Sequence, residues 1–181
     1  HGVSMKQYLT YGPLVIELRD FLQENMWCHW YWKLDAFRCP ETKSPDIIIE
    51  KSTKSYSTNQ LLYEEQTGFF IKQYYLSENG YIWQLSRKKS NHIIIQYYIS
   101  DDWRNIKLIK DESQSYGFAS FEFLGSILSF SVIQFSILSF HGVFMEYMGK
   151  GILICASSET GKTTHARLWR DEKHSLIING D

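Results

Sequence analysis

Residues 151–164 read Gly151-Ile152-Leu153-Ile154-Cys155-Ala156-Ser157-Ser158-Glu159-Thr160-Gly161-Lys162-Thr163-Thr164. The first five residues are a compact apolar run, which we interpret as a buried strand. The next eight match the phosphate-loop pattern G-x-x-x-x-G-K-[ST], except that alanine occupies its first position. A helical sequence continues to Arg170, so the order strand, loop, helix that this pattern requires is complete.

Each part of this segment suits the binding of phosphate. Backbone N–H groups of the loop can surround phosphate oxygens, and the helix that follows directs the positive end of its dipole at them. Lys162 would add a point charge near the outer phosphates, and the Thr163 hydroxyl would ligate Mg²⁺. We therefore predict that the loop residues bind a nucleotide. These residues are Ala156, Ser157, Ser158, Glu159, Thr160, Gly161, Lys162, Thr163 and Thr164.

Two residues depart from the usual pattern. Ala156 replaces a glycine at the tight turn into the loop, where alanine fits only if its φ stays negative. Glu159 occupies a position that often holds a second glycine, and it brings a negative charge near the phosphates. Its side chain would either point to solvent or weaken nucleotide affinity, so that lost binding remains an alternative.

A second short apolar segment, residues 175–178, leads into Asn179-Gly180-Asp181. An aspartate at the end of a strand beside the loop is well placed to hold Mg²⁺, directly or through water. From the residues alone, a turn that closes a strand is an equal alternative. Because the sequence stops in what looks like a strand, we expect it to be a fragment of a longer protein.

The stretch His141-Gly142-Val143-Phe144-Met145-Glu146-Tyr147-Met148-Gly149-Lys150-Gly151-Ile152-Leu153-Ile154, followed by the loop, resembles the catalytic core of HPr kinase/phosphorylase. It is also similar to the wider group of HPr-kinase-like proteins related to phosphoenolpyruvate carboxykinase. The resemblance covers about residues 118–181. It consists of a histidine–glycine start, two strands around a glycine turn, the loop, and an acid on the next strand.

This resemblance implies ATP and Mg²⁺ as cofactors and transfer of the γ-phosphoryl group to a hydroxyl. It implies that His141 is a catalytic residue near the transferred phosphate, and that Asp181 is a metal ligand or the base. HPr kinase usually carries two adjacent acids where this chain has Asn179-Gly180-Asp181, which is closer to relatives found near peptide-modification genes. The alternative for His141 is a buried core histidine at a helix end.

Residues 1–115 carry the signals of a β-rich meander. Four segments bounded by turn residues are expected to form strands: 46–50, 69–75, 81–85 and 93–99. The Asn79-Gly80 turn and the polar turn at 87–91 predict two hairpins. The polar stretch 51–67 is expected to be a surface excursion. Residues 13–38 predict a strand or short helix followed by an aromatic-rich core segment, and no site is indicated in this region.

Residues 123–145 contain no charged residue when His141 is counted as neutral. Length alone makes this stretch a candidate membrane span. We instead expect a buried core helix of about 20 residues, because serines and Gln134 interrupt the run and no cluster of lysine or arginine flanks it.

The composition limits the classes of partner. The chain has 181 residues, with 19 basic and 20 acidic side chains and a formal net charge of -1. This balance gives no case for nucleic acid or an anionic membrane surface. The three cysteines Cys28, Cys39 and Cys155 lack metal-like spacing and are interpreted as free thiols of a cytoplasmic protein.

We therefore predict an α/β protein with a β-rich N-terminal region, residues 1–115, and an incomplete HPr-kinase-like P-loop core, residues 116–181. The predicted function is an ATP- and Mg²⁺-dependent kinase that phosphorylates a serine hydroxyl of a peptide, protein or small molecule. The alternative is a nucleotide-binding sensor without catalysis, or a degenerate relative. A nucleotide and a hydroxyl-bearing substrate are the expected partners, and a homo-oligomer is compatible with the sequence.

Overall fold

The computed structural model describes residues 5–20, 35–116, 120–157 and 159–179. The chain divides after Ser136 into two compact units. In the first unit the elements are β1 (Lys6–Tyr11), β2 (Leu14–Arg19), η1 (Asp35–Phe37), β3 (Ile47–Lys51), β4 (Gln60–Thr67), β5 (Phe70–Ser77), β6 (Gly80–Arg87), β7 (Ile93–Ser100), β8 (Asn105–Asp111), η2 (Ser113–Tyr116), α2 (Ser120–Ser131) and η3 (Val132–Phe135). In the second unit they are β9 (Val143–Tyr147), β10 (Lys150–Ile154), α3 (Lys162–Lys173) and β11 (Leu176–Asn179). The structure is thus mixed α/β and rich in strands, as predicted.

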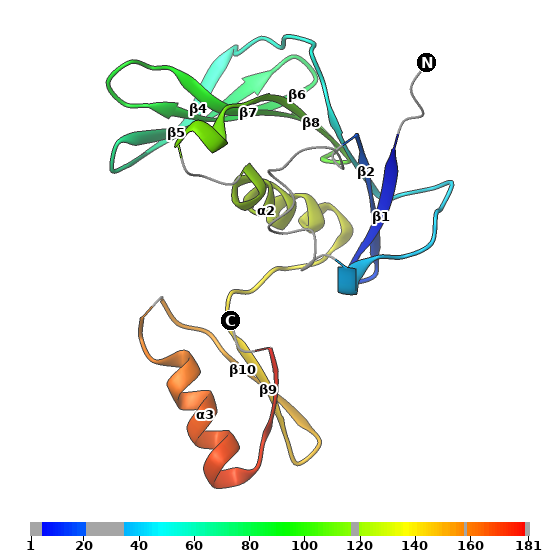
Figure 1. Ribbon diagram of the computed structural model, residues 1–181, viewed down its shortest axis with the longest axis vertical. Helices are drawn as coiled ribbons and strands as arrows, with labels where there is room; N and C mark the ends of the chain where they lie inside the picture. Colours follow the sequence, from blue (N-terminus) through cyan, green and yellow to red (C-terminus); the bar gives the residue numbers. More distant parts are fainter. Residues whose placement is uncertain (1–4, 21–34, 117–119, 158, 180–181) are drawn as a thin grey trace. The chain divides into compact units, whose positions relative to one another are not determined.

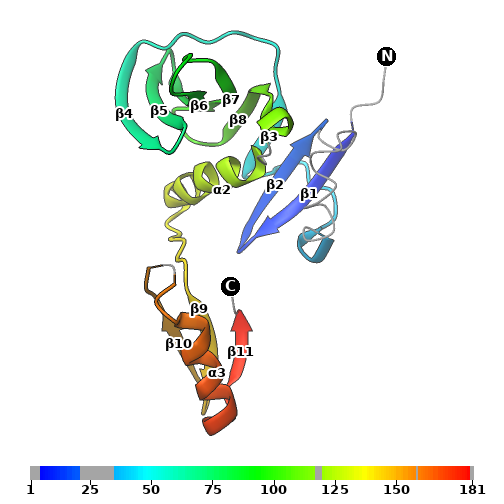
Figure 2. The same ribbon diagram turned by 60° about the vertical axis from the view of Figure 1, so that its left-hand side comes forward.

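The first unit is built on one sheet of eight strands in the order β1-β2-β3-β8-β7-β6-β5-β4 (Figure 1). Strands β4 to β8 form the predicted antiparallel meander. Strand β3 departs from it, because it pairs in parallel with both β2 and β8. The segment 52–59 then carries the chain from β3 to the far edge of the sheet, where β4 begins (Figure 2).

Both predicted hairpins are present. Ser77 pairs with Gly80 across the first turn, in which Asn79 has a φ of 55°. The second turn closes with a hydrogen bond of 2.8 Å from the Arg87 amide to the His92 carbonyl. The stretch 51–67 lies at the surface along β4, as expected, but residues 60–67 also form a strand paired with β5, which the sequence analysis did not predict.

Helix α2 packs against one face of this sheet through Phe123, whose ring lies 6.1 Å from that of Tyr97. The predicted helix of about 20 residues is wrong, because α2 has 12 residues and a 3-10 turn follows it. The Ser131 hydroxyl donates a hydrogen bond to the Ile127 carbonyl, and Ser136 adopts a left-handed φ of 60° that ends the helical path. No helix in the described part of the chain is long and apolar enough to cross a membrane.

The division after Ser136 places α2 with the first sheet, whereas the sequence analysis had placed residues 116–136 with the kinase-like region. The beginning of segment 13–38 was expected to be a strand or a short helix, and it forms strand β2. Most of the aromatic-rich segment predicted after it, residues 21–34, lies outside the described residues.

The second unit is a three-stranded sheet, β10-β9-β11, with α3 on one face (Figure 2). Its small core consists of Val143, Met145 and Ala166, with Ile152, Ile154, Trp169 and Ile177 packed around them. The strand predicted at residues 151–155 is present as β10, but the prediction that it is buried is wrong. Strand β10 lies at the edge of the sheet, and its Leu153 side chain is 47% exposed because α3 covers only the opposite face.

Candidate functional site

Three points of the chain meet at one edge of the sheet in the second unit. Strand β9 is antiparallel to both of its neighbours, and its first residues pair with the last residues of each: Val143 with Ile154, and Phe144 with Asn179. The start of β9 therefore lies beside the ends of β10 and β11. This register brings His141, just before β9, next to the start of the loop that follows β10.

Gly142 makes this close approach possible. A β-carbon on Gly142 would lie 2.7 Å from the Ile154 carbonyl oxygen and 3.1 Å from the Cys155 sulfur. Any side chain here would push the start of β9 away from the point where the loop begins. In the sequence, Gly142 was noted only as part of the family resemblance. Its position directly after His141 could have indicated a close backbone contact there.

The loop between β10 and α3 is a compact turn and not an extended segment. The Thr160 hydroxyl donates a hydrogen bond of 2.7 Å to the Ser157 carbonyl. Two residues adopt left-handed backbone conformations, Glu159 with a φ of 65° and Gly161 with a φ of 88°. Gly161 is the N-cap of α3, so the chain turns sharply there and enters the helix at Lys162.

The Lys162 side chain lies inside this turn. Only 6% of the residue is exposed, and its Nζ donates hydrogen bonds to the carbonyl oxygens of Ala156 at 2.9 Å and Ser157 at 3.0 Å. The first turn of α3 contains no acidic residue. The Lys162 ammonium is thus held by two carbonyl dipoles, while the one acidic side chain of the loop, Glu159, is exposed.

The N-terminus of α3 adds further donors. The first helical amide with a carbonyl partner is that of His165, which bonds to Gly161 at 2.9 Å. The amides of Lys162, Thr163 and Thr164 precede it in the first turn, where no intrahelical acceptor exists. In the described ranges these three amides have no other hydrogen-bond partner, so they are available to an anion.

The remaining predicted site residues fall in three groups. Ala156, Ser157, Glu159, Thr160 and Thr164 are exposed, and Thr163 is half-buried beside Lys162. His141 is exposed, which excludes the alternative of a buried core histidine. Ser158 and Asp181 lie outside the described residues.

The fit of Mg²⁺ depends on few groups. The Thr163 hydroxyl is the one predicted ligand that the structure describes, and it lies in the first helical turn where a phosphate-bound cation would need it. Among the described residues there is no group of three or more histidine, cysteine or acidic side chains that could hold a metal by themselves. Thr163 is therefore the described residue that could hold Mg²⁺ beside phosphate oxygens, and the other predicted ligand, Asp181, lies outside the described residues.

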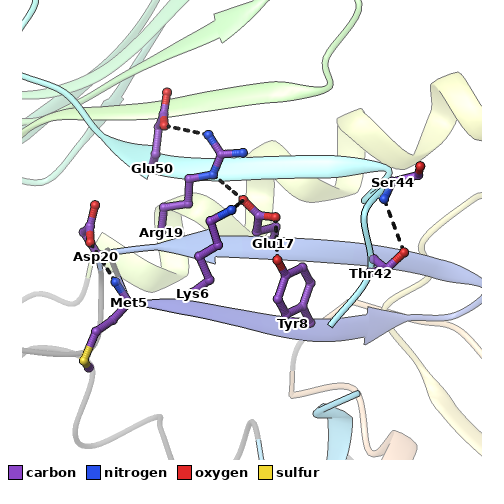
Figure 3. A network of polar contacts seen from close by, with 9 residues as sticks. All are labelled: Met5, Lys6, Tyr8, Glu17, Arg19, Asp20, Thr42, Ser44 and Glu50. Atoms are coloured by element: carbon purple, nitrogen blue, oxygen red, sulfur yellow. Dashed lines mark hydrogen bonds and ion pairs between the residues drawn. The ribbon is translucent and has the colours of Figure 1, made fainter. Parts of the chain in front are cut away.

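A second polar cluster, which the sequence analysis missed, lies on β1, β2 and β3 of the first unit (Figure 3). The buried Glu17 carboxylate accepts a hydrogen bond of 2.9 Å from the Tyr8 hydroxyl and another from the Arg19 Nε. Arg19 also contacts Glu50 at 3.4 Å, and Lys107 contacts the same carboxylate at 3.2 Å. Glu17 and Arg19 lie two residues apart on β2, whereas the Arg19–Glu50 pair joins β2 to β3 and the Lys107–Glu50 pair joins β3 to β8.

The electrostatics of this cluster shift the pKa values of several of its groups, Glu17 and Tyr8 among them. Burial alone would raise the pKa of the Glu17 carboxyl, but the hydrogen bonds from Arg19 and Tyr8 outweigh it and hold the pKa below its usual value. Burial and the hydrogen bond to Glu17 raise the pKa of Tyr8 to about 12. A shallow cavity of about 550 Å³ adjoins the cluster, lined by Lys6, Gln7, Tyr8, Arg38, Cys39 and Glu41.

Comparison with known proteins adds no relative. No family model matches the chain, and no match is found among curated proteins or among solved structures.

Proposed function

We propose that the protein is an ATP- and Mg²⁺-dependent kinase of the HPr-kinase-like, P-loop type, acting in the cytoplasm on a serine hydroxyl of a peptide, protein or small molecule. One observation carries this proposal. A buried lysine ammonium is held on the carbonyls of a tight turn at the N-terminus of a helix, with unpaired helix amides around it. This combination of a cation and backbone donors suits a polyphosphate chain.

In this proposal the residues divide the work of phosphoryl transfer. Lys162 moves from the carbonyls of Ala156 and Ser157 to the outer phosphates, where it offsets charge in the transition state. The loop amides would hold the inner phosphates, and the Thr163 hydroxyl would help to hold Mg²⁺, which would supply positive charge to offset that of the phosphates. The acceptor hydroxyl oxygen attacks the γ-phosphorus, the bond to the bridging oxygen breaks, and ADP leaves. Asp181 or His141 accepts the hydroxyl proton.

The register of the small sheet supports a role for His141. The histidine precedes β9 at the edge where β10 ends and the loop begins, and it is exposed there. An exposed histidine beside a phosphate loop can reach a transferred phosphoryl group without moving the sheet. The same edge receives the end of β11, whose sequence continues to Asp181.

The test compares two lysines of the same helix. Lys162→Met removes the ammonium in the loop, and Lys173→Met removes an exposed ammonium in the last turn of α3. Titration calorimetry with Mg-ATP should show binding that Lys162→Met weakens by about 10- to 100-fold, since a hydrogen bond to a charged group contributes about 1.5–3 kcal/mol. Lys173→Met should bind as the parent protein does. Equal affinity in both variants, or no binding to the parent protein, contradicts the proposal.

One observation favours the alternative of a nucleotide sensor without catalysis. Glu159 places a carboxylate within the loop, at a left-handed φ of 65° that a glycine would adopt more easily. The two functions are separated by turnover. ATP binding with no phosphoryl transfer to any serine-containing peptide, and no ADP release, supports the sensor.

A further inference from the structure

The meander of the first unit carries a continuous row of hydrogen-bonded amides on one face. The Gln96 Nε2 donates to Gln84 at 2.9 Å, the Gln84 Nε2 donates to Gln73 at 2.9 Å, and the Gln73 Nε2 donates to Glu64 at 3.0 Å. These four residues are direct cross-strand partners from β7 to β4. All the donors point toward β4, so the row ends on a carboxylate that can only accept.

A row of aromatic rings crosses the opposite face of the same strands. Tyr63 stacks on Tyr74 at 5.6 Å between ring centroids, and Tyr74 meets Trp83 edge-on at 4.5 Å. Trp83 is paired in turn with Tyr97. This row also ends on β4, where Tyr63 is 57% exposed.

Strand β4 is the last strand of the sheet on this side, and all eight of its residues are exposed. Its register with β5 is interrupted at Leu62, between Leu61 and Tyr63, and is regular from Tyr63 to Thr67. Within the described residues no further strand pairs with β4. An exposed edge of this kind offers backbone groups to an added strand.

We propose that the edge of β4 from Tyr63 to Thr67 binds an extended segment of another polypeptide as an additional strand. The partner segment carries a lysine or arginine that faces Glu64 and an aromatic or branched apolar side chain that faces Tyr63. Such a segment extends both rows by one strand: a charged donor meets the terminal carboxylate, and an apolar group covers the terminal ring. This inference does not depend on the proposed kinase activity.

The sequence of β4 argues against the β4 strand of a second copy as the partner. The strand contains Glu64 and Glu65 and no basic residue, so two copies cannot supply a charged donor to each other. Only Gln66 could offer an amide to Glu64 in an antiparallel pair, because the irregularity at Leu62 puts Gln60 on the opposite face of β4. Pairing with Gln66 sets Glu65 opposite its own copy. The charge of the edge therefore favours a basic segment over a second β4 strand.

The test uses a fluorescent seven-residue peptide of alternating lysine and tyrosine, measured by anisotropy at physiological salt. Successive N–H groups of a strand point to opposite edges, so two N-methylated versions are compared, one methylated at the lysines and one at the tyrosines. The parent peptide should bind, one methylated version should lose at least about tenfold in affinity, and the other should bind nearly as well. Equal effects of both methylation patterns, or no binding of the parent peptide, overturn the proposal.

A charge reversal gives a second, independent readout. Glu64→Lys should weaken binding of the lysine peptide by about tenfold or more and should create binding of the matching glutamate–tyrosine peptide. The control is Glu65→Lys, which makes the same change in net charge on the opposite face of β4, where Glu65 lies 3.7 Å from Lys72. Equal losses in the two variants show attraction by net charge only, and overturn the proposed strand addition.

Discussion

Gly142 packs so closely against the end of β10 that a β-carbon on it would lie 2.7 Å from the carbonyl oxygen of Ile154. The contact holds the start of β9 against Ile154 and Cys155, where the candidate phosphate-binding loop begins. The position of His141 relative to the loop is therefore set by a residue without a side chain.

Replacement of Gly142 by alanine tests this contact. We expect Gly142→Ala to lower the free energy of unfolding of the second unit by about 1–3 kcal/mol, because the added carbon forces backbone atoms apart. Thermal unfolding followed by circular dichroism measures the change. Gly125→Ala is the control. Gly125 lies in helix α2, and a β-carbon on it would meet no atom within 4 Å. That variant should be neutral or more stable by up to about 1 kcal/mol. Equal stability of the two variants contradicts the proposed packing.

Glu159 combines a negative charge with a left-handed backbone, and two substitutions separate these effects. Glu159→Gln removes the charge and keeps a side chain at a φ of 65°, whereas Glu159→Gly removes both. We expect Mg-ATP affinity to rise by about two- to fivefold in both variants, because each removes the negative charge. The left-handed conformation costs about 1 kcal/mol outside glycine in the folded protein, so Glu159→Gly should in addition raise the free energy of unfolding. Calorimetric titration measures the affinities, and urea denaturation measures the stabilities. Unchanged affinity in both would show that the Glu159 carboxylate lies away from the bound phosphates.

The elements that sequence patterns predicted are those with local causes. The Asn79-Gly80 turn and the polar turn at 87–91 closed hairpins where expected, because turn residues and flanking apolar residues act within a few positions of each other. The parallel insertion of β3 between β2 and β8 depends on contacts far apart in the chain. No local pattern in residues 46–50 distinguishes a parallel neighbour from an antiparallel one.

The candidate site shows the same limit. The strand and the helix on either side of the loop were predicted from the run before Ala156 and the helical sequence after Lys162. The edge position of β10 was not predicted, because an apolar run is compatible both with a buried strand and with a strand that is covered on one face only. The hydrogen bonds from Lys162 to Ala156 and Ser157 also depend on a rotamer that no motif specifies.

The buried Glu17 makes the stability of the first unit sensitive to acid. Its pKa is lower in the folded chain than the ordinary value of 4.5, so the ionised carboxylate stabilises the fold at neutral pH. This contribution is fully present above pH 4.5 and is lost as the pH falls through the folded pKa. The pKa of Tyr8 is raised from 10.0 to about 12, so the protonated hydroxyl stabilises the fold. This contribution to stability is lost only as the pH rises above 10 and through about 12.

We therefore expect Glu17→Gln to lower the free energy of unfolding by about 1–3 kcal/mol at pH 7, because Arg19 loses its nearest buried anion. The deficit should shrink as the pH falls below about 4, where the parent protein loses the same interaction. Urea denaturation at several pH values measures both effects. Glu65→Gln, on the exposed edge strand, should change stability by less than about 0.5 kcal/mol. A constant deficit at every pH would mean that the charge of Glu17 is not involved.

The row of hydrogen-bonded amides across the meander, formed by Gln96, Gln84 and Gln73, should show cooperativity between its side chains. Gln84 is 5% exposed and bonds to Gln73 on one side and Gln96 on the other. Gln84→Leu should lower the free energy of unfolding by about 1–3 kcal/mol, because two half-buried amides lose a partner that water does not fully replace. Gln66→Leu, at an exposed position of β4, should stay within about 0.5 kcal/mol of the parent protein.

Removal of the whole row then decides the cause of that loss. When Gln73, Gln84 and Gln96 are all replaced by leucine, no amide of the row is left without its partner, and the apolar side chains can pack on one another. We expect this triple variant to be more stable than Gln84→Leu alone. Replacing all three amides lowers the free energy of unfolding less than leaving buried amides without a hydrogen-bond partner. Chemical denaturation of the three proteins side by side gives the comparison. A triple variant that loses the sum of three single losses would show that each amide contributes independently, and that the row is not a unit.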